Sequence, residues 1–132
     1  MLNGSECICG QKGCLDVYTS GRTWATKKIP NNSSLKKELA KRARFLALGV
    51  ANVLKIFYPK LVIIDGIYNE YEYEFGPVFL DSLSSELRGL KLPVPEVVFG
   101  DAVEFKSSMG AAFMAADKFL EPYLEQKLSQ SQ

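Results

Sequence analysis

The first fourteen residues contain all three cysteines of the chain, which are Cys7, Cys9 and Cys14. Gly10 and Gly13 lie between the second and third cysteines, and glycine allows the backbone to turn sharply enough for thiols to converge. Zinc in structural sites takes four ligands in a tetrahedron and prefers thiolates. We therefore expect a knuckle over residues 6–16 in which the three thiolates bind one zinc ion. The fourth position would go to Asp16, water or a partner chain.

Other uses of these cysteines fit the pattern less well. An odd number of cysteines in one short segment is unlike a secreted disulfide scaffold, and it favours a metal site in a reducing compartment. Three buried thiols without a metal remain the alternative. The chain contains no histidine, which excludes Ser-His-Asp and Cys-His catalysis by this chain alone.

Composition sets limits on the class of protein. A length of 132 residues is enough for one domain with a hydrophobic core. A formal net charge of +1 argues against partners that are nucleic acids or anionic membranes. No apolar run reaches the roughly 18 residues that span a bilayer. The first residues lack a basic region followed by an apolar core, so we expect no signal peptide and a cytoplasmic location.

Two helices are predicted after the knuckle. Residues 15–28 can be helical, although Gly21 weakens this prediction. Residues 35–57 give the strongest helix, with Ser34 as its N-cap and Pro59 ending it. Its apolar stripe consists of Leu35, Leu39, Ala43, Leu46, Val50, Val53, Leu54 and Phe57. The basic residues Lys36, Lys37, Lys41 and Arg42 are expected on the opposite, solvated face.

The second half of the chain predicts two strands that alternate with helices. Residues 61–65 and 96–99 are short apolar runs typical of buried parallel strands. Residues 68–74 alternate aromatic and acidic side chains, and we expect a surface loop there, with a strand as the alternative. Pro77 would lie in the first turn of a helix whose inward residues are Leu80, Leu83, Leu87 and Leu90.

A last helix is expected from Ser107 or Ser108, with a kink or restart at Pro122 and a frayed tail at residues 129–132. Strands that alternate with helices predict an α/β layer containing a parallel pair of strands.

At this point the pattern resembles a known family. Residues 7–16 read Cys-Ile-Cys-Gly-Gln-Lys-Gly-Cys-Leu-Asp, which resembles the zinc signature Cys-x-Cys-Gly-x-x-Gly-Cys-x-Glu of the ROK family of repressors and sugar kinases. Further resemblance covers residues 17–22, 48–54, 58–66 and 110–112. It implies that residues 1–132 form a single C-terminal lobe portion of an actin-like (hexokinase-type, ribonuclease-H-like) α/β fold with a zinc knuckle.

The resemblance also implies roles for single residues. Asp16 stands where the family has a sugar-contacting Glu that is one methylene longer. The alternative for Asp16 is a favourable charge in the first turn of a helix. Asp65, Gly66 and Gly110 would lie near the nucleotide. Their alternatives are a plain strand terminus for the first two and tight helix packing for Gly110.

Departures from the family limit what this chain can do. The family's fourth zinc ligand is a histidine, which this chain lacks, and only Gly66 stands where the family has consecutive glycines. The family's phosphate loop and catalytic Asp belong to an N-terminal lobe outside these residues, and no Gly-rich phosphate loop appears here. We therefore assign no catalytic residue, and ATP with Mg²⁺ is implied only for the complete fold.

Three functions stay open. The first is part of a sugar kinase acting on a hexose or N-acetylhexosamine, inactive as this chain alone. The second is the sugar-sensing or dimerising half of a transcriptional repressor, and the third is a stand-alone zinc-binding interaction module. The expected partners are a missing N-terminal lobe or a second copy, with a sugar as a possible ligand and neither nucleic acid nor membrane.

Overall fold

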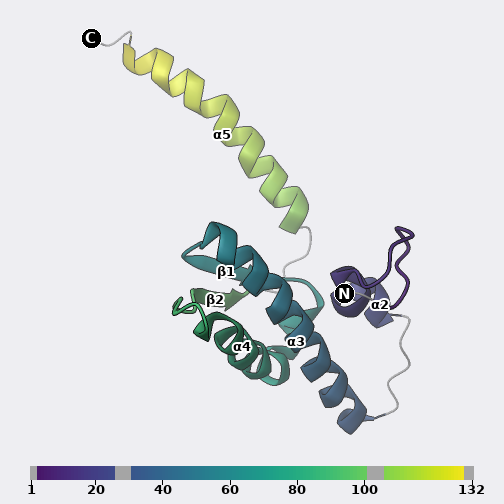
Figure 1. Ribbon diagram of the computed structural model, residues 1–132. Coiled ribbons are helices and arrows are strands. Elements are labelled where there is room, and N and C mark those ends of the chain that lie inside the picture. Colours follow the sequence, from purple (N-terminus) through teal and green to yellow (C-terminus); the bar gives the residue numbers. More distant parts are fainter. Residues whose placement is uncertain (1–2, 26–30, 101–105, 130–132) are drawn as a thin grey trace. The chain divides into compact units, whose positions relative to one another are not determined.

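The computed structural model describes residues 3–25, 31–100 and 106–129. They fall into two compact units, Met1–Asp101 and Ala102–Gln132, and each is described here by itself. The expectation of a single lobe over residues 1–132 therefore stays a prediction. The elements of the first unit are α1 (Leu15–Thr19), α2 (Gly21–Ala25), α3 (Asn32–Phe57), β1 (Leu61–Ile64), the 3₁₀ helix η1 (Ile67–Tyr71), α4 (Glu72–Arg88) and β2 (Glu96–Phe99) (Figure 1).

The long helix α3 confirms the strongest sequence prediction. It begins three residues earlier than expected, because Asn31 rather than Ser34 is the N-cap and accepts a hydrogen bond from the Ser34 N–H at 2.9 Å. It ends at Phe57, and the C-cap residue Tyr58 takes a left-handed conformation with φ of 43°. Pro59 follows and disfavours helical geometry at the residue before it, as predicted.

The two predicted strands form a parallel pair. Their register runs from Leu61 opposite Glu96 to Ile64 opposite Phe99. Helices α3 and α4 lie alongside one another, and one face of the strand pair packs against them (Figure 1). The buried apolar residues of this core are Leu39, Ala43, Ala47, Ala51, Leu54, Ile64, Tyr68, Phe75, Phe79, Leu83 and Leu87.

The prediction of a surface loop at residues 68–74 is wrong, because this segment forms η1 and the first turn of α4. Tyr68 and Phe75 are 5% and 0% exposed, and their rings stack at 4.2 Å. Tyr68, Tyr71 and Phe75 follow one another at three- and four-residue steps, so burial on one helical side explains the aromatic pattern. Pro77 consequently lies inside α4 rather than in its first turn.

Two further expectations about the helices are corrected. In α4, Leu83 and Leu87 are buried as expected, whereas Leu80 is 40% exposed. Leu90 lies beyond the helix end and is 52% exposed. Residues 15–28 do not form one helix, because Ser20 is extended and separates α1 from α2. Residues 26–28 lie outside the described part of the chain.

The second unit contains α5 (Lys106–Ser129). This helix was predicted from Ser107 or Ser108, and it includes Pro122 without a restart. Ser129 is its last residue, so it is helical rather than frayed, while residues 130–132 of the expected tail are outside the described residues.

Candidate functional site

The cysteine segment folds into a tight turn as the glycines predicted. Gly10 and Gly13 take φ angles of 84° and 74°, a region that side chains rarely adopt. The Cys7 N–H donates to the Gln11 carbonyl at 2.8 Å, and Glu6 bridges to Lys12 across the turn. The three cysteine sulfur atoms lie within 4.8 Å of one another. Within the described residues this is the one cluster of at least three groups that could hold a metal ion.

The electrostatics of the cluster favour a cation. The Sγ atoms of Cys9 and Cys14 are 3.5 Å apart. This contact raises the pKa of Cys14 to about 11, with smaller contributions from desolvation and from Cys7. The pKa of Cys9 is lowered, first by a backbone hydrogen bond from Gln11 and then by the Cys14 thiol. Three thiolates this close repel one another unless a cation compensates them, and all-sulfur donors suit zinc.

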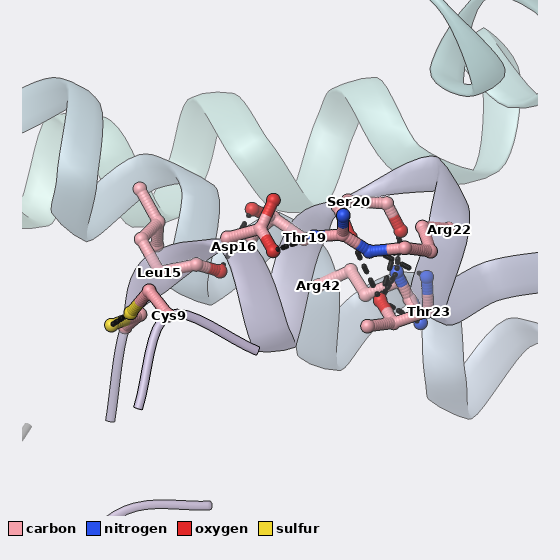
Figure 2. A network of polar contacts seen from close by, with 9 residues as sticks. Cys9, Leu15, Asp16, Thr19, Ser20, Arg22, Thr23 and Arg42 are labelled. Atoms are coloured by element: carbon pink, nitrogen blue, oxygen red, sulfur yellow. Dashed lines mark hydrogen bonds and ion pairs between the residues drawn. The ribbon is translucent and has the colours of Figure 1, made fainter. Parts of the chain in front are cut away.

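The cluster leads directly into the helix that carries Asp16. Cys14 is the N-cap residue of α1, and Asp16 lies in the first turn of this helix. The Asp16 carboxylate accepts from the guanidinium of Arg22 in α2, and the two side chains are 46% and 54% exposed (Figure 2). Asp16 is not part of the cysteine cluster, which contains Cys7, Cys9 and Cys14 alone.

Helix α1 packs on α3, and two of the contacts between them involve Tyr18 and Leu15. The rings of Tyr18 and Phe45 are 4.5 Å apart. A Cβ added to Gly49 would lie 2.4 Å from Leu15, so glycine at this position allows the two helices to approach closely. A pocket of about 210 Å³ remains beside these contacts, lined by Gly13, Leu15, Tyr18, Phe45, Leu48, Gly49 and Asn52.

The prediction that Arg42 lies on a solvated face is wrong, because its relative exposure is 2%. Its Nε donates to Glu38 at 3.0 Å, and its Nη1 donates to the Ser20 carbonyl at 3.1 Å. The helical spacing could have shown this, since Arg42 follows Leu39 by three residues and precedes Leu46 by four, on the apolar side of α3.

The residues expected near a nucleotide lie apart from the cysteine segment in the sequence. Asp65 and Gly66 follow β1, and the Asp65 carboxylate accepts from the Gly66 N–H and from the Asn69 amide, both at 2.7 Å. Gly66 has a φ of 90°, which favours glycine. The Gly100 N–H at the end of β2 donates to the Ile64 carbonyl at 2.8 Å, so both strands end side by side. Gly110 lies in α5 of the second unit.

No helix in the described part of the chain is long and apolar enough to cross a membrane. No family model matches the chain. It is 32% identical over 131 residues to an N-acetyl-D-glucosamine kinase of Yersinia enterocolitica (serotype O:8 / biotype 1B). This match covers 86% of the chain but only 42% of that relative.

Among solved structures, the chain is similar to the ROK hexokinase from Thermus thermophilus. The TM-score is 0.63 at 20% sequence identity, over 79% of this chain and 40% of that one. This second likeness shows that the chain shares the fold of part of that enzyme. The sequence relationship and the shared fold agree with the resemblance to the ROK family seen in the cysteine signature, and the chain spans about two fifths of the length of each of these two proteins.

Proposed function

We propose that the chain is the sugar-facing part of a ROK-type sugar kinase. In this proposal, Cys7, Cys9 and Cys14 hold a structural zinc ion, and Asp16 accepts a hydrogen bond from a hydroxyl of a hexose or N-acetylhexosamine. The observation that carries it is the short connection between the two groups, since Cys14 is the N-cap residue of the helix whose first turn contains Asp16. A relationship to an N-acetylglucosamine kinase supports the class of sugar.

The zinc ion would act as a cross-link within the knuckle. When bound, it would compensate the charge of three thiolates and fix the backbone around Gly10 and Gly13. Because Asp16 lies outside the cysteine cluster, water or a partner chain is the better candidate for the fourth position.

The nucleotide would be bound on another part of the chain. We propose that Asp65 and Gly66, after β1, and Gly110, in α5, face the nucleotide in the complete family fold. Phosphoryl transfer needs a group that accepts the proton of the sugar hydroxyl and a phosphate cradle with Mg²⁺. We assign neither to this chain, and we therefore propose that it does not catalyse phosphorylation by itself.

The partner would be the remainder of the family fold, because the chain spans 42% of the length of its curated relative. Apolar side chains exposed on the first unit support an interface; those on α3 and β1 include Val53 at 52%, Ile56 at 75%, Phe57 at 76% and Ile63 at 62%. Exposed apolar patches of this kind mark interaction sites. If the chain alone sediments as a dimer, a second copy is its partner. A 14.7 kDa monomer that binds no hydrophobic dye would contradict both a second copy and the remainder of the fold as partners.

Sugar binding tests the proposal directly. The chain supplied with one equivalent of zinc is titrated with N-acetylglucosamine and with glucose by calorimetry. Asp16→Asn is expected to weaken binding about tenfold or more, because a carboxylate makes a stronger hydrogen bond than an amide. Its zinc content should stay unchanged. Asp81→Asn, an exposed carboxylate on α4, is the matched control and should bind like the unmodified chain.

Two outcomes would contradict the proposal. An unmodified, zinc-loaded chain that binds neither sugar removes the sugar-facing role. A coupled assay that detects ATP-dependent phosphorylation by the chain alone contradicts its inactivity. Phosphorylation that appears only after a separately expressed remainder of the fold is added would support the split arrangement.

A further inference from the structure

The corner between α1 and α2 is held by side chains from other elements. The last carbonyls of a helix have no partner within that helix. Here the Thr19 carbonyl accepts from the hydroxyl of Tyr68 in η1. The Ser20 carbonyl accepts from Arg42 in α3 at 3.1 Å. Two residues that are 5% and 2% exposed therefore fix the point at which the chain turns from α1 into α2.

The buried Arg42 contacts more of this corner than one carbonyl. Both of its terminal nitrogens lie 3.4 Å from the hydroxyl of Thr23 in α2. Its guanidinium lies 5.1 Å from the ring centroid of Trp24, and Glu38 accepts from its Nε. Figure 2 shows Arg42 beside Ser20 and Thr23. A planar guanidinium can serve these groups together, whereas the ammonium of a lysine is a single point charge.

We infer that Arg42 is a positioning residue for Asp16, an inference that rests on the proposed sugar-binding role of that carboxylate. Arg42 fixes α2 through Ser20 and Thr23, and α2 carries Arg22, which contacts the Asp16 Oδ2. Asp16 thereby lies between two constraints: the cysteine segment leads into its helix at Cys14, and Arg42 fixes the helix whose arginine orients the Asp16 carboxylate.

The expected consequence concerns the carboxylate rather than the whole fold. With Arg22 on Oδ2, the other oxygen of the partly exposed Asp16 can accept from a ligand hydroxyl. If α2 is released, the carboxylate gains rotamer freedom that ligand binding must remove again. Loss of Arg42 should therefore weaken sugar binding, while the cysteine cluster, which precedes the N-terminal end of α1, should still bind zinc.

Two variants and one control test this inference. Arg42→Lys keeps the charge but loses the planar fork. Thr23→Val removes the hydroxyl that Arg42 reaches, which also donates to the Ser20 carbonyl at 2.9 Å. Arg44→Lys makes the same exchange at an exposed position of α3 and serves as the control. The first measurement is the side-chain Nε–Hε NMR resonance of Arg22, with Asp16→Asn as the reference for a broken contact. The second is the affinity for N-acetylglucosamine together with the zinc content.

The expected results are distinct. Arg42→Lys should move the Arg22 resonance toward its position in Asp16→Asn, and should weaken N-acetylglucosamine binding about tenfold with zinc retained. Thr23→Val should do the same to a smaller degree, about threefold. Arg44→Lys should change neither. The fluorescence of Trp24, the one tryptophan in the chain, reports whether the corner has moved.

An unchanged Arg22 resonance in folded Arg42→Lys and Thr23→Val would overturn the inference, even if the melting temperature falls, because Arg42 would then act on stability alone. If Arg42→Lys does not fold, Thr23→Val decides the question. An unmodified chain that binds no sugar contradicts the proposed function, whereas the Arg22 resonance still decides whether Arg42 positions Asp16.

Discussion

The cysteine and corner segment (residues 3–25) and the helical core of α3, α4 and the strand pair are ordered by different forces. Neither α1 nor α2 contains a buried residue. The segment depends on glycine turns, hydrogen bonds, a cluster of thiols and a few ring contacts such as Tyr18 on Phe45. The core instead buries eleven apolar side chains, among them Phe75 and Phe79 at 0% exposure. Every candidate metal ligand and the proposed sugar ligand lie in the first region.

This difference implies that one region stabilises the fold and the other positions the candidate ligand groups. Apolar burial is non-directional and contributes about 25 cal/mol per Å². It stabilises the core without fixing where a single carboxylate points. Metal–thiolate bonds and charge-assisted hydrogen bonds are directional. We therefore expect changes in the core to act on the free energy of unfolding, and changes in the cysteine and corner segment to act on ligand and metal binding.

Truncation of Phe79 should have the largest effect on the core. Phe79→Ala removes a fully buried ring that stacks on Phe75 at a centroid distance of 5.8 Å. Lost burial and the resulting cavity are expected to lower the free energy of unfolding by about 3–5 kcal/mol, measured by denaturant titration. Tyr73→Ala, at a side chain that is 92% exposed, should change it by less than about 0.5 kcal/mol. Equal losses in the two variants would refute the assignment of the core.

A methyl group at Gly4 should act mainly on the cysteine segment. A Cβ there would lie 2.5 Å from the Gly13 Cα and 2.6 Å from the Tyr18 hydroxyl. Overpacking of this kind costs about 1–3 kcal/mol, so Gly4→Ala should weaken zinc binding about tenfold, measured by competition with a chelating dye. Gly89→Ala is the control, because no atom lies within 4 Å of a Cβ at that position. Unchanged zinc affinity in Gly4→Ala would mean that the segment has room to shift.

Tyr68 joins the two regions, and its hydroxyl can be removed with little change in packing. Tyr68→Phe leaves the Thr19 carbonyl without its donor, while the ring can still stack on Phe75. We expect a loss of about 1 kcal/mol in the free energy of unfolding and a shift in Trp24 fluorescence. Tyr73→Phe should change neither quantity. A stability loss without a fluorescence shift would show that the hydroxyl does not hold the corner.

Removal of the metal should have the smallest effect on the core. Cys14→Ser, or a strong chelator, is expected to remove hydrogen-exchange protection from the amides of residues 6–16. Amides of α3 and α4 should keep their protection within about 0.5 kcal/mol, because no cysteine contributes to that core. Ile8→Ser, at a side chain that is 80% exposed, should leave both sets of amides unchanged. Global loss of protection on chelation would break the distinction between the regions.

The sequence by itself determined the local parts of this protein. Three cysteines with Gly10 and Gly13 between them can converge without help from distant residues, and the structure brings their sulfur atoms together. The period of apolar residues predicted α3, and two short apolar runs predicted the parallel strands. These features depend on steric limits of the backbone and on hydrophobic spacing, and both can be seen within a window of a few residues.

Only the tertiary structure decided which polar groups meet. Arginine is a residue type that usually lies at the surface. Arg42 is buried because of its contacts with Ser20, Thr23 and Trp24, which lie 18 to 22 positions away along the chain. The break at Ser20 and the pairing of Asp16 with Arg22 likewise depend on the packing of α1 and α2 against α3 and η1. A buried guanidinium is stable only where several acceptors converge on it, and that convergence exists only after the chain has folded.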